Sequence, residues 1–392
     1  MKGYETKKLV EGVKSDVPET RKAVMAGLKA ALASGQIDPK QFNANRLFAE
    51  CFGQSLLEEY RDEQGFSFQQ VKETAGATST SAFLNITQQF MASNFQDAYE
   101  IPEQIFTKLI PTVSTKRRFE RVAGVSQIGD EAQVVEEGKE YPLVGPSEDW
   151  TDTPEARKRG MTAAITKETL MFDETNLVVE RVRAIGEWLG INHEKRAIDC
   201  IVDENTLNHR YNWRGVVYSS YRDTPWDNLS ASSAFVDYKS LDTVRQLFMG
   251  ITDPQTGEPQ GFMARHLIVP PSLQLTAAFA LGGIVQQLPG GFATSGTPTR
   301  SELPNPINTV LGMSPMVVSS QLFISRMATK TNWFLGDITK YAEYREVWPV
   351  TLDQIGAGSQ NDFDRDIVQQ WKASSMGAFR VKNPRALVKA TV

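Results

Sequence analysis

The chain has 392 residues, a formal net charge of −5 and 41% apolar residues. This length and composition suit a soluble protein with two or three domains, and they exclude a chain that is disordered throughout. The mild acidity argues against nucleic-acid binding through bulk charge, because such proteins usually present a basic face. Two cysteines, Cys51 and Cys200, cannot supply a disulfide framework, so we expect a reducing compartment. We find no secretory signal and no run as long as a membrane span, which predicts a protein with no membrane partner.

The first 81 residues are polar and favour helix. Pro18 suits a first helical turn and Gly35 suits a helix end. Three apolar residues recur every four positions between them: Val24, Leu28 and Leu32. A second helix is expected over residues 43–64. The Thr, Ala, Gly and Ser residues of 74–81 predict a flexible linker or an extended arm.

A long polar ribbon is predicted over residues 118–167, after a further helical piece within 82–117. The two ends of the ribbon, 118–122 and 161–166, favour strand and are expected to run out and back as a pair. The middle is rich in charged and turn-forming residues. A two-stranded ribbon with few core residues is not stable by itself. We therefore expect the ribbon to lie on a neighbouring copy of the chain.

Helical periodicity returns between Asp173 and Val202. The apolar residues of one stripe are Val178, Val182, Ile185, Leu189, Ala197 and Ile201. A helix over this range would be about 45 Å long, which suits the spine of an extended molecule. The stripe is interrupted near Asn192 and His193, and we expect His193 to be solvated or to cap the helix.

Residues 209–392 predict a mixture of helices and strands. Helices are expected at 240–249 and 273–281, and strands at 266–269, 316–318, 333–335, 344–352, 366–371 and 378–381. The residues from Asp253 onward, DPQTGEPQG, predict a turn. The Gly-, Pro-, Ser- and Thr-rich stretch 289–306 predicts an exposed loop.

Sequence signatures of catalysis and metal binding are missing. His193-Glu194 begins a zinc-protease pattern, which ends in Ala197 where a second histidine is needed. The aspartates at 362, 364 and 366 lack the glycine and glutamate of a calcium loop, although a weak cation site shared with another subunit stays open there. The charged residues at 136–140 could be paired carboxylates, but a solvated ribbon tip whose charges meet a neighbour is the better interpretation. We expect no catalytic residue, no cofactor and no metal.

The order of these segments resembles the major capsid proteins of tailed phages, which have the Hong Kong phage capsid fold that encapsulins share. The resemblance rests on three stretches: 160–168 leading to Asp173, 311–318 leading to 334–337, and 363–371 followed by Phe379 and 383–389. It covers about residues 82–392. Within the family, the chain looks closest to the Mu-like major head subunits.

The resemblance implies an α+β chain that is divided into named parts. These are a helical N-terminal extension and N-arm (1–81), the first part of a P-domain (82–117), an E-loop ribbon (118–167), the P-domain spine helix (168–208), an A-domain (209–340) and P-domain closing strands (341–392). It also implies assembly contacts at the E-loop tip, the A-domain pore loop and the P-domain. The residues expected there are, in that order, Glu136, Glu137, Lys139 and Tyr141; Pro289, Gly290 and Gly291; and Phe363, Asp366 and Trp371. Lys139 and Asn383 offer the residue types for a crosslink between subunits, on which we place no expectation.

The function implied is structural. Copies would form hexamers and pentamers that close an icosahedral shell around double-stranded DNA, without sequence-specific contacts. Expected partners are other copies, scaffolding and portal proteins, and decoration or maturation-protease proteins. The shell would assemble in the cytoplasm of a bacterial host and end in the virion. Two alternatives stay open: an encapsulin-type compartment around a cargo enzyme, which the long N-terminal extension disfavours, and an enzyme with dispersed carboxylates.

Overall fold

The computed structural model divides the chain into two compact units. The first combines residues 1–104, 158–192 and 348–376, and the second combines residues 105–157, 193–347 and 377–392. The residues that the structure describes are 18–34, 77–100, 103–123, 134–141, 150–166, 177–204, 211–213, 215–224, 226–253, 257, 259, 261–282, 285–287, 302–304, 315–355 and 367–392. The chain is a mixed α+β protein, as predicted. Among these residues, no helix is both long and apolar enough to cross a membrane.

Two helices at the start of the described chain pack together in the first unit. They are α2 (Pro18–Ala33) and α6 (Ala77–Tyr99). Leu28 and Leu32 of α2 are buried, which confirms the four-residue spacing predicted there. On α6 the buried residues are Ile86, Phe90, Met91 and Phe95, which lie on one face because their spacing follows the helical period.

The helix α9 (Leu177–Val202) contributes residues to both units. In the first unit, its buried stripe contains Val182, Ile185 and Leu189, as predicted. A Cβ atom at Gly186 would lie 2.5 Å from the backbone oxygen of Phe95, and one at Gly190 would lie 2.6 Å from that of Tyr99. These two glycines therefore let α9 approach the backbone of α6 more closely than any other residue type would.

The second unit contains a five-stranded sheet with the order β11-β8-β12-β15-β7. The strands are β7 (Leu229–Ser230), β8 (His266–Ile268), β11 (Met316–Val318), β12 (Trp333–Gly336) and β15 (Leu387–Ala390). The central strand β12 runs antiparallel to both β8 and β15. The outer strands β11 and β7 run parallel to their neighbours.

The three central strands of this sheet, β8, β12 and β15, are buried on both faces. On β12, Phe334 packs into a cluster with Ala197, Ile198 and Ile201 of α9, whereas Trp333 and Leu335 pack into the opposite cluster. Strands buried on both faces read as continuous apolar runs, which explains why the sequence predicts them well.

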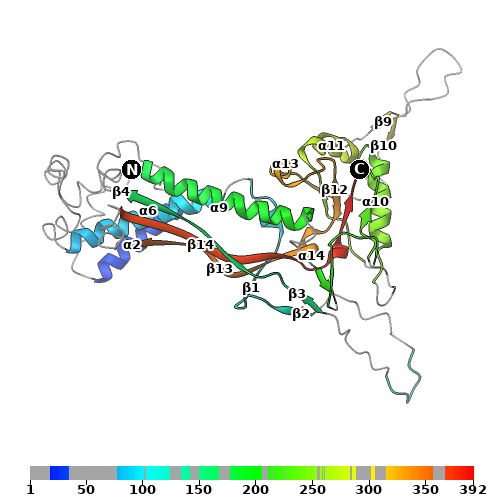
Figure 1. Cartoon of the computed structure of the whole chain (residues 1–392), viewed down its shortest axis with the longest axis horizontal. Coiled ribbons are helices and arrows are strands. Elements are labelled where there is room, and N and C mark those ends of the chain that lie inside the picture. The colour runs from blue at the N-terminus through cyan, green and yellow to red at the C-terminus, as the bar shows by residue number, and fades with distance from the viewer. Residues whose placement is uncertain are drawn as a thin grey trace, which may run out of the picture. The chain divides into compact units, whose positions relative to one another are not determined.

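Three helices contribute residues to the cluster that contains Trp333 and Leu335 or pack against it. They are α10 (Tyr238–Gly250), α11 (Gln274–Gly282) and the short η2 (Pro271–Leu273), and Figure 1 shows α10 beside β12. The carboxylate of Asp237 caps α10 by accepting hydrogen bonds from the N–H groups of Lys239 and Ser240, at 3.0 Å each. Burial of an apolar side chain such as Leu241 or Phe248 stabilises this packing by about 1.5–3 kcal/mol.

Three further sheets complete the described strands. Strands β2 (Arg121–Ala123), β3 (Trp150–Asp152), β5 (Tyr211–Trp213) and β6 (Val216–Tyr218) form one sheet, and β9 (Val285–Gln287) pairs with β10 (Glu302–Pro304) in another. The last has the order β1-β13-β14-β4, from β1 (Thr112–Ser114), β13 (Ala342–Ile355), β14 (Ile367–Val381) and β4 (Arg157–Thr166). The remaining short helices are α7 (Phe106–Leu109), α13 (Phe323–Arg326), α14 (Ile338–Tyr341) and η3 (Pro384–Ala386).

Several sequence predictions are wrong in these regions. Residues 77–81 begin helix α6 and are not a linker or arm. The strand pairing of 118–122 with 161–166 is also wrong, because β2 pairs with β3, while β4 lies in the sheet of β14. Residues 302–304 of the predicted loop form a strand. The predicted strands 366–371 and 378–381 are one continuous strand, β14.

Other predictions fall outside the described residues or meet small shifts of boundary. The predicted helix over 43–64 lies outside the described residues, and so does the part of the helix predicted from Asp173 that precedes Leu177. Helices α10 and α11 and strands β8, β11 and β12 confirm the predicted segments within two residues. The final strand, β15, pairs with β12 and β7.

Candidate assembly surfaces

Residues 134–141, the described middle of the predicted ribbon and called here the ribbon tip, contain a tight turn between Glu136 and Lys139. The backbone N–H of Lys139 donates to the carbonyl of Glu136 at 3.1 Å, and Gly138 has φ +85°. Glu137, the second turn residue, is not among the residues with positive φ, so the positive φ of the third residue indicates a type II turn, which favours glycine there. Nothing lies within 4 Å of a Cβ built at Gly138, so the backbone alone requires the glycine.

The predicted tip residues are exposed and close together. Glu136, Glu137 and Lys139 are all exposed, and the carboxylate of Glu136 lies 2.5 Å from the Lys139 ammonium. Tyr141 is 85% exposed and Val134 is 97% exposed. Exposed apolar side chains that lie close together are typical of a surface that binds another protein.

The described segments 118–123 and 150–157, called here the ribbon base, are joined to each other around Glu120. The backbone N–H of Thr153 donates to the carbonyl of Glu120 at 2.9 Å, and the backbone N–H of Glu120 donates to the Thr153 hydroxyl at 2.9 Å. The Glu120 carboxylate accepts from the Thr115 hydroxyl at 3.2 Å and lies 3.5 Å from Arg345. The base is therefore held in place by both backbone and side-chain contacts.

A buried ion cluster lies beneath this base. One oxygen of Glu343, Oε1, accepts from Arg345 Nε and from Arg380 Nε, each at 2.5 Å. Arg380 also reaches the Thr151 hydroxyl of β3 at 3.5 Å. Burial alone raises the pKa of Glu343, but the hydrogen bonds and charges of Arg380 and Arg345 outweigh it and hold that pKa below its ordinary value.

The other predicted assembly residues do not form a described surface. Pro289, Gly290, Gly291, Phe363 and Asp366 lie outside the described residues. Trp371 is described, and its side chain is fully buried in the first unit. A direct contact of Trp371 with another subunit is therefore excluded in this conformation.

Asn383 is also buried, being 2% exposed. Its side-chain oxygen caps the short helix η3 by accepting from the backbone N–H of Arg385 at 3.1 Å. The residue therefore has a structural role, and a bond to a lysine of another subunit would require this segment to open.

The His193-Glu194 pair is structural. His193 is 6% exposed and packs edge-on against the rings of Tyr344 and Phe379, with centroids 4.7 and 5.0 Å away. Burial, with a smaller contribution from the charge of Arg196, lowers the pKa of His193 to about 3. The prediction of a solvated or capping histidine is therefore wrong.

Glu194 supplies the cap instead. Its carboxylate accepts from the backbone N–H groups of Ile105, Phe106 and Thr107 at 3.0, 2.8 and 2.9 Å, and so satisfies the start of α7. Within the described residues, no group of three or more His, Cys, Asp or Glu side chains could hold a metal. Burial raises the pKa of the Cys200 thiol, which keeps it protonated and a poor nucleophile.

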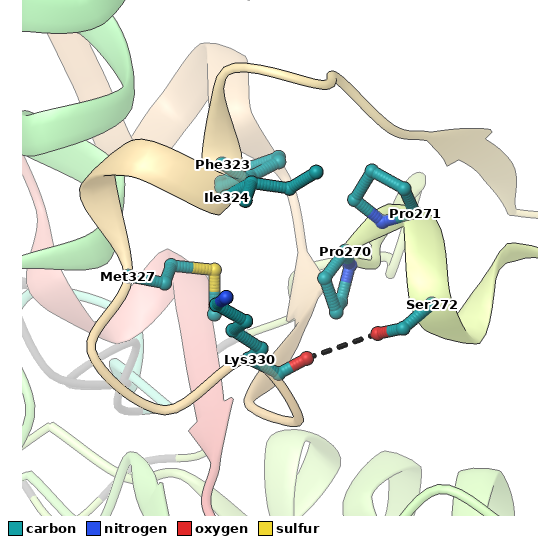
Figure 2. A pocket seen from close by; sticks show the side chains of 7 residues that line it. All are labelled: Pro270, Pro271, Ser272, Phe323, Ile324, Met327 and Lys330. Atoms are coloured by element: carbon teal, nitrogen blue, oxygen red, sulfur yellow. Dashed lines mark hydrogen bonds between the residues drawn. The ribbon is translucent and has the colours of Figure 1, made fainter.

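A small apolar pocket opens between η2 and α13 (Figure 2). Pro270, Pro271 and Ser272 lie on one side, and the other side is lined by Phe323, Ile324, Met327 and Lys330. The Ser272 hydroxyl donates to the carbonyl of Lys330 at 3.0 Å across it. The volume is about 160 Å³, below the roughly 300–1,000 Å³ of small-molecule sites.

Exposed apolar side chains also lie on α11. Leu275 and Phe279 are 69% and 70% exposed and are four residues apart, so they share one helix face. The opposite face packs Ala277 and Ala280 into the core of the second unit. The helix is predicted from the sequence but its exposed apolar face is not, although the near-continuous apolar composition of α11 indicates one.

A basic surface at the ribbon base was also missed. Lys116, Arg117 and Arg118 are exposed, as is Arg157 at the start of β4. The backbone N–H of Ala156 donates to the carbonyl of Arg118 at 2.9 Å, which brings the two basic segments together. The runs Lys-Arg-Arg and Arg-Lys-Arg were visible in the sequence. Their proximity was not.

Exposed charged and apolar surfaces on a rigid frame are features of a protein that acts through contacts with other proteins. The sequence profile of a family described as "Phage capsid protein" matches residues 151–390. The chain belongs to this phage capsid protein family. It is a phage capsid protein, which is a structural role and not an enzymatic one.

Solved structures with detectable similarity include phage capsids, a virus-like particle and an encapsulin. The virus-like particle of Pyrococcus furiosus aligns with 77% of this chain and 98% of its own, at 12% identity and a TM-score of 0.43. The capsid of cyanophage P-SCSP1u aligns with 73% of this chain and 87% of its own, at 12% identity and a TM-score of 0.45. The SrpI encapsulin of Synechococcus elongatus PCC 7942 aligns with 74% of this chain and 87% of its own, at 10% identity and a TM-score of 0.43. No curated protein matches the chain.

Proposed function

We propose that the chain adopts the Hong Kong phage capsid fold and that its copies form hexamers and pentamers, which close the shell around double-stranded DNA. In this assignment, residues 118–167 form the E-loop, 209–340 form the A-domain, and α9 is the spine of the P-domain. The A-domains meet around the local axes, and the loop of residues 289–306 faces the central pore.

The observation that carries this proposal is the uncovered tip of the ribbon. Val134 and Tyr141 are almost fully exposed beside Glu136 and Glu137, although the base of the same ribbon is tightly held. Contact of the ribbon tip with another subunit would remove the side chains of Val134 and Tyr141 from water, which stabilises the assembly. This supports an E-loop that crosses onto the adjacent copy.

The exposed apolar face of α11 supports contacts between A-domains. Leu275 and Phe279 together present a hydrophobic strip that water covers in a lone subunit. Interfaces of this kind contribute modestly one at a time, but a closed shell repeats them in every copy. Many moderate contacts can therefore hold a container against packed DNA.

Partners and location follow from the same proposal. Scaffolding and portal proteins, with decoration or maturation-protease proteins, take part in assembly within the cytoplasm of a bacterial host. The DNA is enclosed without sequence-specific contacts, in keeping with the acidic net charge. The Mu-like subgroup is the proposed place of the chain within the family.

The test is deletion of residues 130–146 in the full chain. The wild type is expected to yield megadalton particles, or hexamers and pentamers, by size-exclusion chromatography with light scattering and by negative-stain microscopy. The deletion variant is expected to stay soluble and folded by circular dichroism but not to close shells. Normal yields of shells from this variant would contradict the E-loop assignment. Particles filled with a cargo protein and free of DNA would favour an encapsulin-type compartment.

A further inference from the structure

The basic surface at the ribbon base is unusual for this chain. Lys116, Arg117, Arg118 and Arg157 are exposed within one hydrogen-bonded patch, although the chain as a whole carries a net charge of −5. The carboxylate of Glu155 pairs with Arg118 at 2.8 Å, but both side chains stay largely exposed, at 49% and 67%. An exposed pair of this kind contributes little to stability, so folding of the subunit does not account for the cluster.

An aromatic side chain lies within the same segment. Phe119 directly follows Arg118 and is 55% exposed. The patch is also held in place, because the backbone N–H of Thr115 donates to the carbonyl of Glu346 at 2.8 Å. A fixed surface that combines several cations with an exposed ring fits a partner that combines carboxylates with apolar groups.

The chain itself carries such a partner at the ribbon tip. Residues 134–141 present the carboxylates of Glu136, Glu137 and Glu140 around a type II turn, with Lys139 as the single cation. Val134 and Tyr141 flank these charges and are the most exposed large apolar side chains in the described chain. The tip and the basic surface therefore complement each other in charge and in apolar character.

We propose that the ribbon tip of one copy, residues 134–141, docks on the basic surface of a neighbouring copy, formed by Lys116, Arg117, Arg118, Phe119 and Arg157. This inference rests on the proposed function, because it requires that the ribbon crosses to an adjacent subunit. Each copy offers one tip and one basic surface. The contact is therefore heterologous, and repeating it around an axis closes a ring.

A nucleic-acid partner fits the observations less well. Phosphate binding would account for the cations, but it would leave the uncovered Tyr141 and Val134 and the acidic tip without a partner. Docking between copies covers both surfaces at once. The charged contacts set which surfaces meet and how fast, while the apolar side chains supply the area that is removed from water.

The test is a charge exchange in the full chain. Lys116→Glu with Arg117→Glu, and separately Glu136→Lys with Glu137→Lys, are each expected to reduce the yield of shells about tenfold or more at moderate salt, because like charges then face each other. The combined four-fold variant is expected to recover most of the lost yield. Arg181→Glu with Arg183→Glu is the matched control, since both side chains are exposed on α9, and it is expected to assemble as the wild type does.

The outcomes separate this inference from the proposed function. Shells at wild-type yield from either charge-reversed pair would overturn the docking site while leaving shell formation in place. Loss in both pairs without recovery in the combined variant, with all variants folded and soluble, would also overturn it. Normal shells from the Lys116–Arg117 variant that contain less DNA would assign the basic surface to phosphate contacts. A wild type that forms no assembly under any condition would overturn both proposals.

Discussion

Glu343 and Arg380 form an ion pair in the interior of the second unit, with 2.5 Å between Oε1 and Nε and only 5% of each side chain exposed. The same carboxylate oxygen also accepts from Arg345. Through Thr151 and Glu120, the two arginines contact the base of the ribbon. A buried charge cluster therefore fixes the segment from which the ribbon projects.

Replacement of Glu343 by glutamine is expected to destabilise the subunit by about 3 kcal/mol, because it leaves the buried guanidinium group of Arg380 without its counter-charge, whereas Arg345 keeps Glu120 at 3.5 Å. The pKa of Glu343 is held below its ordinary value of 4.5. Its contribution is therefore complete above pH 4.5 and is lost as the pH falls through the lower folded value. Chemical denaturation at pH 7 and at successively lower pH would measure this, with the difference between wild type and variant shrinking in acid.

Glu346→Gln is the matched control on the same strand. The backbone carbonyl of Glu346 accepts a hydrogen bond from Thr115, and among the described contacts Arg380 pairs with Glu343 and not with the Glu346 side chain. The control is expected to keep wild-type stability. A difference between wild type and Glu343→Gln that stays constant from pH 7 to pH 3 would contradict the assignment of charge to this cluster.

His193 is expected to stay neutral well into the acid range. Because burial lowers its pKa to about 3 from 6.5, the unfolded chain takes up a proton at a pH where the folded chain does not. The free energy of unfolding should therefore fall by about 1.4 kcal/mol per pH unit below pH 6.5 from this residue alone. His193→Phe should remove that slope, which denaturation between pH 7 and pH 4 would show. A histidine resonance of the wild type that is assigned to His193 and titrates near pH 6 would contradict the prediction.

The burial of His193 also shows the limit of reading one segment at a time. Local periodicity predicted the apolar stripe of α9 correctly, but it treated His193 as an interruption because of its residue type. The rings that bury it, Tyr344 and Phe379, come from strands that lie far along the chain. No local pattern around residue 193 carries that information, so only the tertiary contact identifies this histidine as part of the core.

Among the strands too, local sequence predicts some features, whereas others depend on tertiary contacts. Strands β8 and β12 are buried on both faces, and their apolar runs made them predictable. The partner of β2 was missed because β3 is short and polar, with the sequence Trp-Thr-Asp, and pairing depends on the turn and on neighbouring strands. Residues 77–81 were missed for another reason. Small polar residues allow a linker, yet their place at the start of a helix that packs on α2 overrides that preference.

The ribbon was predicted from the sequence only in part. Its charged tip was predicted from composition, and the exposed residues Glu136, Glu137, Lys139 and Tyr141 agree with a solvated turn. The basic surface was not predicted, although both basic runs stand in the sequence, because the hydrogen bond from Ala156 to Arg118 that joins them is a tertiary contact. Composition thus indicates which residue types are available, and folding decides which of them act together.

Alanine at Gly186 or Gly190 is expected to destabilise the first unit, although alanine favours helix by about 1 kcal/mol. The added Cβ would lie 2.5 Å from the backbone oxygen of Phe95 or 2.6 Å from that of Tyr99, and backbone atoms cannot move aside cheaply. Overpacking of this kind costs about 1–3 kcal/mol, so the net effect should be a loss. Gly250→Ala is the control, because nothing lies within 4 Å of its Cβ. Thermal unfolding of the three variants would be compared, and equal melting temperatures would contradict the close approach of α9 and α6.

Asn228→Leu is expected to be among the most damaging single changes in the second unit. The buried side-chain amide donates to the carbonyls of Ser220 and Pro384 at 2.8 Å each, and its oxygen accepts from the N–H of Arg222 at 2.8 Å. Leucine would remove these three hydrogen bonds and leave the buried Pro384 carbonyl without this donor, at a cost of about 1–3 kcal/mol before any relaxation. The Ser220 carbonyl would keep the indole N–H of Trp226 at 3.4 Å. Because the amide joins the loop before β7 to the segment before β15, its loss should loosen the edge of the five-stranded sheet. Hydrogen exchange should then speed up at β7 and β15. The control Asn192→Ala, at an exposed site on α9, should leave that exchange unchanged. Wild-type protection in Asn228→Leu would show that water replaces the amide.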